Sequence, residues 1–264
     1  MKGIVLTGRA VTVGPALVSV CLAFSLALPA RADTDPNACR GIDFDVKRPL
    51  VASRVSARPH VNFIKGSDDD AACPTGKEAC RKKAYVVPGD IVLTGRVQGA
   101  FTCVSYQSFR TRKQNWTTGW LPTSSLTPIA PMPAPKAVNW IGSWSHPGGT
   151  ISISRGEGGK LSIAGEHTYP AAQNVHSGVL GATIAPTQGV IAFAEDGTIP
   201  FDQAEEGQCL VRMQRIGAWL LVEDNQQCGG SMVTFTGLSP RLDALELLGW
   251  NLRSQDTVLF AAAK

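Results

Sequence analysis

The sequence predicts an all-β fold of two consecutive antiparallel domains, followed by a short C-terminal helix. Short segments that alternate apolar and polar residues recur along the chain, as at 150–154 (TISIS) and 211–214 (VRMQ). This alternation is typical of half-buried strands. Turns containing glycine or proline separate the segments at the intervals of a small barrel or sandwich. The proline-rich segment 128–135 divides the strands into two groups, which predicts one domain on each side of it.

The N-terminal segment 1–32 has the composition of a signal peptide. Lys2 and Arg9 precede an apolar stretch, whose strongest run is shorter than the roughly 20 residues that a membrane-spanning helix needs. The small-x-small motif at 30–32 (ARA) fits a signal-peptidase site. We therefore expect a periplasmic or secreted protein, with no membrane span after cleavage and no nucleic-acid partner. A membrane anchor is the competing interpretation.

The cysteines predict disulfides. The chain has 7 cysteines, and Cys21 lies within the expected signal peptide, which leaves an even number. Export and the lack of any Cys-x-x-Cys pair favour disulfides over a metal site. The favoured pairing is Cys209 with Cys228, Cys73 with Cys80 and Cys39 with Cys103. The first pair is the firmest because its two cysteines stand alone in the second half of the chain. The other four allow three pairings, among which the sequence does not choose.

The first domain, 33–128, reads as short strands joined by turns. The expected strands are 50–55, 84–87, 91–96, 101–107 and 116–121. Segment 60–78 interrupts them as a long polar insertion. Basic residues gather in two places, at Arg81, Lys82 and Lys83, and at Arg110, Arg112 and Lys113. Such clusters can hold anionic polymers, but more often they form a solvated face.

Three motifs of this domain carry a resemblance. Residues 85–90 (YVVPGD), 101–106 (FTCVSY) and 118–122 (TGWLP) resemble, in order and spacing, a bacterial Src-homology-3-like domain over 49–128. The resemblance implies a small barrel with a short helical turn after the GWLP element. It also implies a non-catalytic domain that binds cell-wall glycopeptides, peptides or neighbouring domains. The family's aromatic groove would draw on Tyr106, Trp116 and Trp120; the alternative is that Trp120 is a core residue.

This chain departs from the family pattern in two ways. Ser125 stands where eukaryotic relatives place the tyrosine that lines the polyproline site, which argues against polyproline recognition. The insertion 60–78 falls in the loop that usually shapes the groove.

A proline-rich linker, 129–138, leads to the second domain, 139–241. The expected strands are 150–154, 160–165, 175–182 and 190–193, and three more lie within 209–237. Together they predict a small antiparallel barrel or sandwich. In the tail, 242–264, Leu242, Leu245 and Leu248 are spaced for a short amphipathic helix.

The second domain also carries a resemblance. Residues 142–144 (GSW), 209–212 (CLVR), 222–225 (VEDN) and 233–237 (VTFTG) resemble an envelope domain found at the C-terminus of lysozyme-inhibitor-like and uncharacterised proteobacterial proteins. The closing tyrosine and arginine of that pattern are replaced by 238–241 (LSPR). The polar loop at Glu223, Asp224 and Asn225 is the candidate binding site of this domain.

The chemistry sought in the sequence points to binding and away from catalysis. His60, His146, His167 and His176 sit in no catalytic or metal-binding motif, and cysteines held in disulfides supply no thiolate nucleophile. We expect no enzyme activity, no cofactor and no bound metal. The favoured function is a cell-envelope binding protein for a cell-wall polymer or an envelope protein such as a wall hydrolase. The alternative is a barrel that carries a small hydrophobic ligand. The sequence predicts no oligomeric state.

Overall fold

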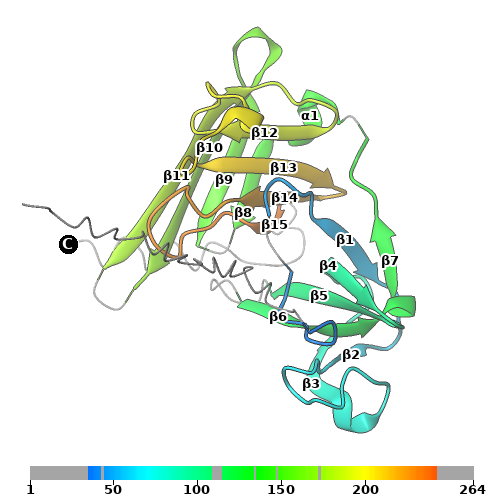
Figure 1. The fold of residues 1–264 in the computed structure, drawn as a ribbon. Helices are drawn as coiled ribbons and strands as arrows, with labels where there is room; N and C mark the ends of the chain where they lie inside the picture. The colour runs from blue at the N-terminus through cyan, green and yellow to red at the C-terminus, as the bar shows by residue number, and fades with distance from the viewer. Residues whose placement is uncertain are drawn as a thin grey trace, which may run out of the picture. The chain divides into compact units, whose positions relative to one another are not determined.

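A computed structural model describes residues 35–42, 45–108, 115–133, 135–146, 148–171 and 174–242. Over these residues the strands form three antiparallel sheets, and the predicted all-β fold is confirmed (Figure 1). The predicted signal peptide 1–32, the basic cluster at 110–113 and the tail helix predicted beyond residue 242 lie outside the described residues. No helix in the described ranges has the length and apolar character to cross a bilayer.

The first half of the chain builds one seven-stranded sheet, in the order β3-β2-β6-β5-β4-β1-β7. Its strands are β1 (Val51–Val55), β2 (Val61–Ile64), β3 (Arg81–Val86), β4 (Ile91–Gln98), β5 (Phe101–Ser108), β6 (Asn115–Pro122) and β7 (Leu126–Ile129). Three-residue 3-10 turns, Glu78–Cys80 and Thr123–Ser125, precede β3 and β7. The second turn follows the GWLP segment, where the resemblance places a helical turn.

Two elements of this sheet differ from the sequence expectation. Strand β2 lies inside the predicted polar insertion, because Phe63 and Ile64 supply two adjacent buried apolar side chains. Strand β7 runs through Pro128 to Ile129, the first residue of the predicted linker. Pro128 pairs with Ser53 of β1, and its missing N–H is tolerated because β7 lies at the edge of the sheet.

The second half contains two four-stranded sheets that share one core. One sheet has the order β11-β10-β9-β8 and the other β12-β13-β14-β15. The elements are helix α1 (Ala137–Trp140), β8 (Gly142–His146), β9 (Gly149–Arg155), β10 (Leu161–Pro170), β11 (Val175–Ile184), β12 (Val190–Ala194), β13 (Leu210–Ile216), β14 (Trp219–Asp224) and β15 (Gly237–Pro240). Side chains of both sheets, among them Trp144, Phe193 and Met213, fill the space between them.

The last strand of the second half is displaced from its predicted position. The alternation at 232–236 predicts a strand there, but β15 begins only at Gly237. Val233 and Phe235 are buried in the core as expected for inward-facing residues. The backbone around them is instead bonded to the side chain of Asp224, so the segment is fixed without joining the sheet ladder.

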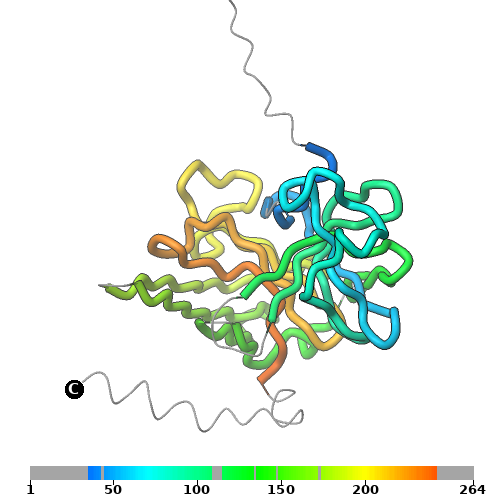
Figure 2. Tube along the Cα trace, turned by 90° about the horizontal axis from the view of Figure 1, so that it is seen from below, coloured from blue at the N-terminus to red at the C-terminus, as the bar shows by residue number. Residues whose placement is uncertain are grey.

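The two halves pack against each other through a second hydrophobic cluster. Leu50 and Leu93 of the first half meet Leu221 and Leu238 of the second. Near this cluster, Val46 packs on Ala194 and Leu210. Val46 belongs to the segment 45–50, which is blue in Figure 2. The figure shows this segment between the cyan strands of the first half and the yellow and orange strands of the second. The face of the β12–β15 sheet that points away from its own core is therefore covered by the first half.

Candidate binding site

The predicted aromatic groove is not assembled. Tyr106 of β5 pairs with Thr117 of β6, whereas Trp116 pairs with Gln107. Paired residues share one face of a sheet and successive residues alternate between faces, so Tyr106 and Trp116 lie on opposite faces. Tyr106 borders the cluster around Phe63, and Trp116 borders the cluster between the two halves. The expectation that they form one binding surface is wrong.

Trp120 is a core residue and presents no surface to a ligand. Its side chain is 0% exposed, and its Nε1 donates a hydrogen bond of 3.0 Å to the backbone oxygen of Asn37. The guanidinium of Arg96 lies 5.9 Å from the centroid of its ring. The binding role predicted for Trp120 is therefore wrong, and the alternative that it belongs to the core is confirmed.

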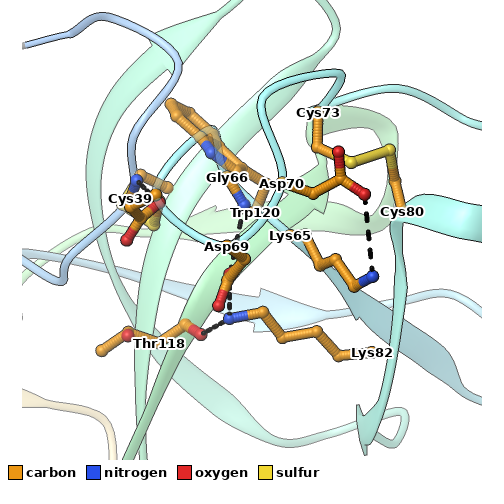
Figure 3. A network of polar contacts seen from close by, with 12 residues as sticks. Cys39, Lys65, Gly66, Asp69, Asp70, Cys73, Cys80, Lys82, Thr118 and Trp120 are labelled. Atoms are coloured by element: carbon orange, nitrogen blue, oxygen red, sulfur yellow. Dashed lines mark hydrogen bonds and ion pairs between the residues drawn. A yellow bond between two sulfur atoms is a disulfide. The ribbon is translucent and has the colours of Figure 1, made fainter.

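The insertion is tied to the sheet by a polar network (Figure 3). Nζ of Lys82 lies 2.6 Å from Oδ2 of Asp69 and donates to the backbone oxygen of Thr118 at 3.4 Å. The hydrogen bond from Lys82 holds the pKa of Asp69 below its ordinary value. On the same insertion, Lys65 and Asp70 form a longer ion pair of 3.9 Å. These contacts fix the insertion in place. The insertion and the N-terminal segment together occupy the region beside Trp120, where the predicted groove would open.

Three disulfides fasten these segments. Cys39 is bonded to Cys103, Cys73 to Cys80 and Cys209 to Cys228, the pairing favoured from the sequence. The first bond anchors the N-terminal segment on β5, and the backbone N–H of Cys39 also donates to Oδ1 of Asp68 in the insertion. The second closes the insertion on itself. The third joins the start of β13 to the loop after β14.

Asp224 is a buried structural residue, which corrects its predicted place in an exposed loop. It ends β14 and is 1% exposed. Its Oδ1 accepts hydrogen bonds from the hydroxyls of Thr234 at 2.6 Å and Thr236 at 2.7 Å. Its Oδ2 accepts from the backbone N–H of Phe235 at 3.1 Å. Two carboxylate oxygens thus hold the segment that leads into β15.

Asn225 holds the other side of the same turn. Its Oδ1 accepts the backbone N–H of Leu210 at 2.9 Å, and its Nδ2 donates to the backbone oxygen of Gln208 at 2.7 Å. The amide therefore joins the end of β14 to the start of β13. Its side chain is partly exposed, so it lies at the surface while its polar atoms have partners.

Glu223 lies between the two halves and is only 2% exposed. Its Oε1 accepts the backbone N–H of Leu50 at 3.2 Å, whereas its Oε2 has no hydrogen-bond partner among the described residues. Burial raises the pKa of Glu223 to about 7, although attraction to Arg212 and the bond from Leu50 oppose this. Asp45 raises the pKa further. The predicted surface role of Glu223 is therefore wrong, and the carboxyl serves the interface.

An open cleft lies beside this interface, with walls from both halves of the chain. It has a volume of about 550 Å³ and is lined by residues 45–47, 204–207, 210 and 224–227. Asp224 and Asn225 lie in one wall, so the structure places two of the predicted binding residues here. None of Asp45, Glu205 and Glu206 was named as a candidate binding residue in the sequence analysis. The sequence signal that could have indicated this cleft was the pair of adjacent glutamates, Glu205 and Glu206, in a polar turn.

A buried histidine pair is the nearest approach to catalytic chemistry. The rings of His146 and His167 lie 5.3 Å apart in the core of the second half. The Oγ of Ser239 is 3.5 Å from Nδ1 of His146, but Ser239 is fully buried and no substrate can reach it. Burial lowers the pKa of His146 to about 3, which keeps the imidazole neutral. Over the described residues, no three His, Cys, Asp or Glu side chains gather as metal ligands.

A scan against protein-family models and searches of curated proteins and solved structures find no match to this chain. Both family resemblances drawn from sequence motifs therefore stay predictions.

Proposed function

We propose that this chain is an exported, non-catalytic binding protein of the cell envelope that recognises cell-wall material through the cleft between its two halves. The observation that carries the proposal is the cleft itself, because its walls combine Asp45 of the first half with carboxylates and amides of the second half. A volume of about 550 Å³ falls within the range of about 300 to 1,000 Å³ typical of ligand sites.

The polar groups of the cleft suit a ligand rich in hydroxyl and ammonium groups. Glu205 and Glu206 are exposed acceptors, and Gln226 and Gln227 offer exposed amides that both donate and accept. Glycopeptides of a cell wall carry sugar hydroxyls, acetamido groups and amine-bearing peptide stems. The neutral amides of the cleft can form hydrogen bonds with the hydroxyl and acetamido groups, and the carboxylates can attract the amines.

The carboxylates of the cleft act as hydrogen-bond acceptors and not as acid–base catalysts. The hydrogen bond from Arg48 and that from the backbone N–H of Lys47 hold the pKa of Asp45 below its ordinary value. Asp45 is therefore ionised at neutral pH and has no proton to deliver. The three disulfides fit a non-cytoplasmic compartment, which supports an envelope location.

Co-sedimentation with purified peptidoglycan tests the proposal. We expect the protein to pellet with the polymer and Glu206→Lys to reduce the bound fraction about tenfold, since the substitution reverses a charge in the cleft wall. Glu157→Lys, in an exposed turn outside the cleft lining, is the matched control and should pellet like the parent. Loss of binding in Trp116→Ala but not in Glu206→Lys would move the site to the first half. Failure of the parent to pellet would reject a cell-wall ligand.

A further inference from the structure

We infer that the free edge of β3 accepts an extended acidic peptide segment of a partner protein as an additional strand. This inference concerns a surface away from the cleft and does not depend on the proposed function. β3 ends the seven-stranded sheet and pairs on one side only, with β2. An unpaired edge presents main-chain N–H and C=O groups that an extended segment can join.

β3 is better suited to such pairing than the edge strands β7 and β11. The opposite edge of the same sheet, β7, is only 4 residues long and contains Pro128, which lacks a donor. Just beyond β7, the N–H of Met132 is already bonded to the backbone oxygen of Arg215. Along β11, Gly178 is bridged to Gly229. By contrast, β3 is 6 residues long, and four of its residues are exposed.

The side chains of β3 define the charge of the partner. Lys82 forms an ion pair with Asp69, whereas Arg81 and Lys83 are exposed. The pairing of β3 with β2 shifts register between Asn62 and Ile64. Arg81 meets Glu78 at 2.9 Å in a solvent-exposed pair, which contributes little, and Lys83 makes no ion pair with a described residue. Two cations at alternate positions therefore match acidic residues at alternate positions of an added strand.

The C-terminal end of the strand adds an apolar anchor point. Tyr85 is 54% exposed and its ring lies 5.0 Å from that of His60. Arg58 and Pro59, which precede His60 in the chain, and Pro88, which follows Tyr85, line a shallow and open hollow. An aromatic ring or proline of the partner can pack here. Lysines alone also serve to block aggregation at a sheet edge, but that role requires no exposed tyrosine beside a hollow.

The same charges argue against a second copy of this chain as the partner. If two β3 strands paired in parallel, or antiparallel about Lys82, then Arg81, Lys82 and Lys83 of each would approach those of the other. Like charges placed across adjacent strands destabilise the pairing. An acidic segment removes this repulsion and gains attraction instead, which is why the inferred partner is a different, acidic chain.

Fluorescence anisotropy with a labelled pool of seven-residue peptides tests the inference. The pool carries Asp or Glu at the first and third positions and Tyr, Phe or Pro at the fifth. We expect saturable binding that weakens with added salt and is at least about tenfold weaker for Lys83→Glu. Lys160→Glu, an exposed lysine in the second half, is the charge-matched control and should bind like the parent. Thermal unfolding checks that both variants fold.

Three outcomes would overturn the inference. A pool with alternate backbone nitrogens methylated keeps its charges but loses main-chain donors, so equal binding would show attraction to charge without strand pairing. Absence of binding up to about 1 mM peptide would remove the edge as a docking surface. A dimer of the parent protein in light scattering that Lys83→Glu abolishes would assign β3 to self-association.

Discussion

Replacing Glu223 with glutamine should stabilise the protein, and most strongly at alkaline pH. The side chain is buried between the two halves, and its pKa is raised from 4.5 to about 7. Glutamine keeps an oxygen that can accept the hydrogen bond from the N–H of Leu50 and has a similar volume. The substitution therefore removes a buried charge while leaving the interface contact in place.

The magnitude follows from the two pKa values. In the native state Glu223 binds its proton more tightly than in the unfolded chain, so stability falls as the pH rises from about 4.5 to about 7 and changes little above that range. At about 1.4 kcal/mol for each pH unit, the ionised carboxylate costs the native state about 3 kcal/mol. The expected gain of Glu223→Gln is therefore about 3 kcal/mol at pH of about 8 and below about 1 kcal/mol at pH of about 5.

Urea unfolding of both proteins at the two pH values, with disulfides intact, measures this difference. Taking variant minus parent at each pH cancels the titration of other groups. Glu157→Gln, an exposed glutamate in the turn before β10, should show no difference at either pH. The reasoning is refuted if Glu223→Gln gains no more stability at pH of about 8 than at pH of about 5.

Three further outcomes are expected. The pKa of His146 falls from 6.5 to about 3 in the native state, so stability is lost as the pH drops through this interval; His146→Gln should flatten that loss in acid titrations followed by circular dichroism. Asp224→Asn leaves fewer acceptors for the donors around Phe235 and should cost about 2 kcal/mol in urea unfolding. The double replacement Cys209→Ser with Cys228→Ser opens a loop of sequence separation 19 and should cost about 3 kcal/mol, seen as a lower thermal midpoint.

Local sequence patterns were sufficient to predict many of the strands. Alternation and turn residues located strands such as β5 and β13 because each pattern is contained within its own segment. The pair Cys209 and Cys228 was firm because these two cysteines stand alone in the second half of the chain. The strand β2 was missed because the two apolar residues Phe63 and Ile64 stand among polar neighbours. The backbone there is held in an extended conformation by pairing with neighbouring strands, which the local sequence does not indicate.

The candidate site was less predictable because it depends on long-range packing. Residues 223–225 are strongly polar and read as a solvent-exposed loop, yet Glu223 is covered by a segment that begins 173 positions earlier in the chain. Asp224 is buried because Thr234, Thr236 and Phe235 supply donors to it. The identity of three consecutive residues does not indicate whether hydrogen-bond donors from distant parts of the chain will pack against them. The cleft was missed for the same reason, since Asp45 and Glu205 line one cleft only after the halves pack.

The sites proposed here follow from how the two halves use their surfaces. The N-terminal segment lies over Trp120, and the insertion next to it is fixed by ion pairs and a disulfide, so the surface that the resemblance assigns to ligands is occupied by the chain itself. The outer face of the β12–β15 sheet is likewise consumed, because it carries the packing between halves. Two places that remain open to a partner are the margin of that packing, where the cleft lies, and the strand β3, which ends the first sheet. Both proposed sites therefore lie at borders of the sheets.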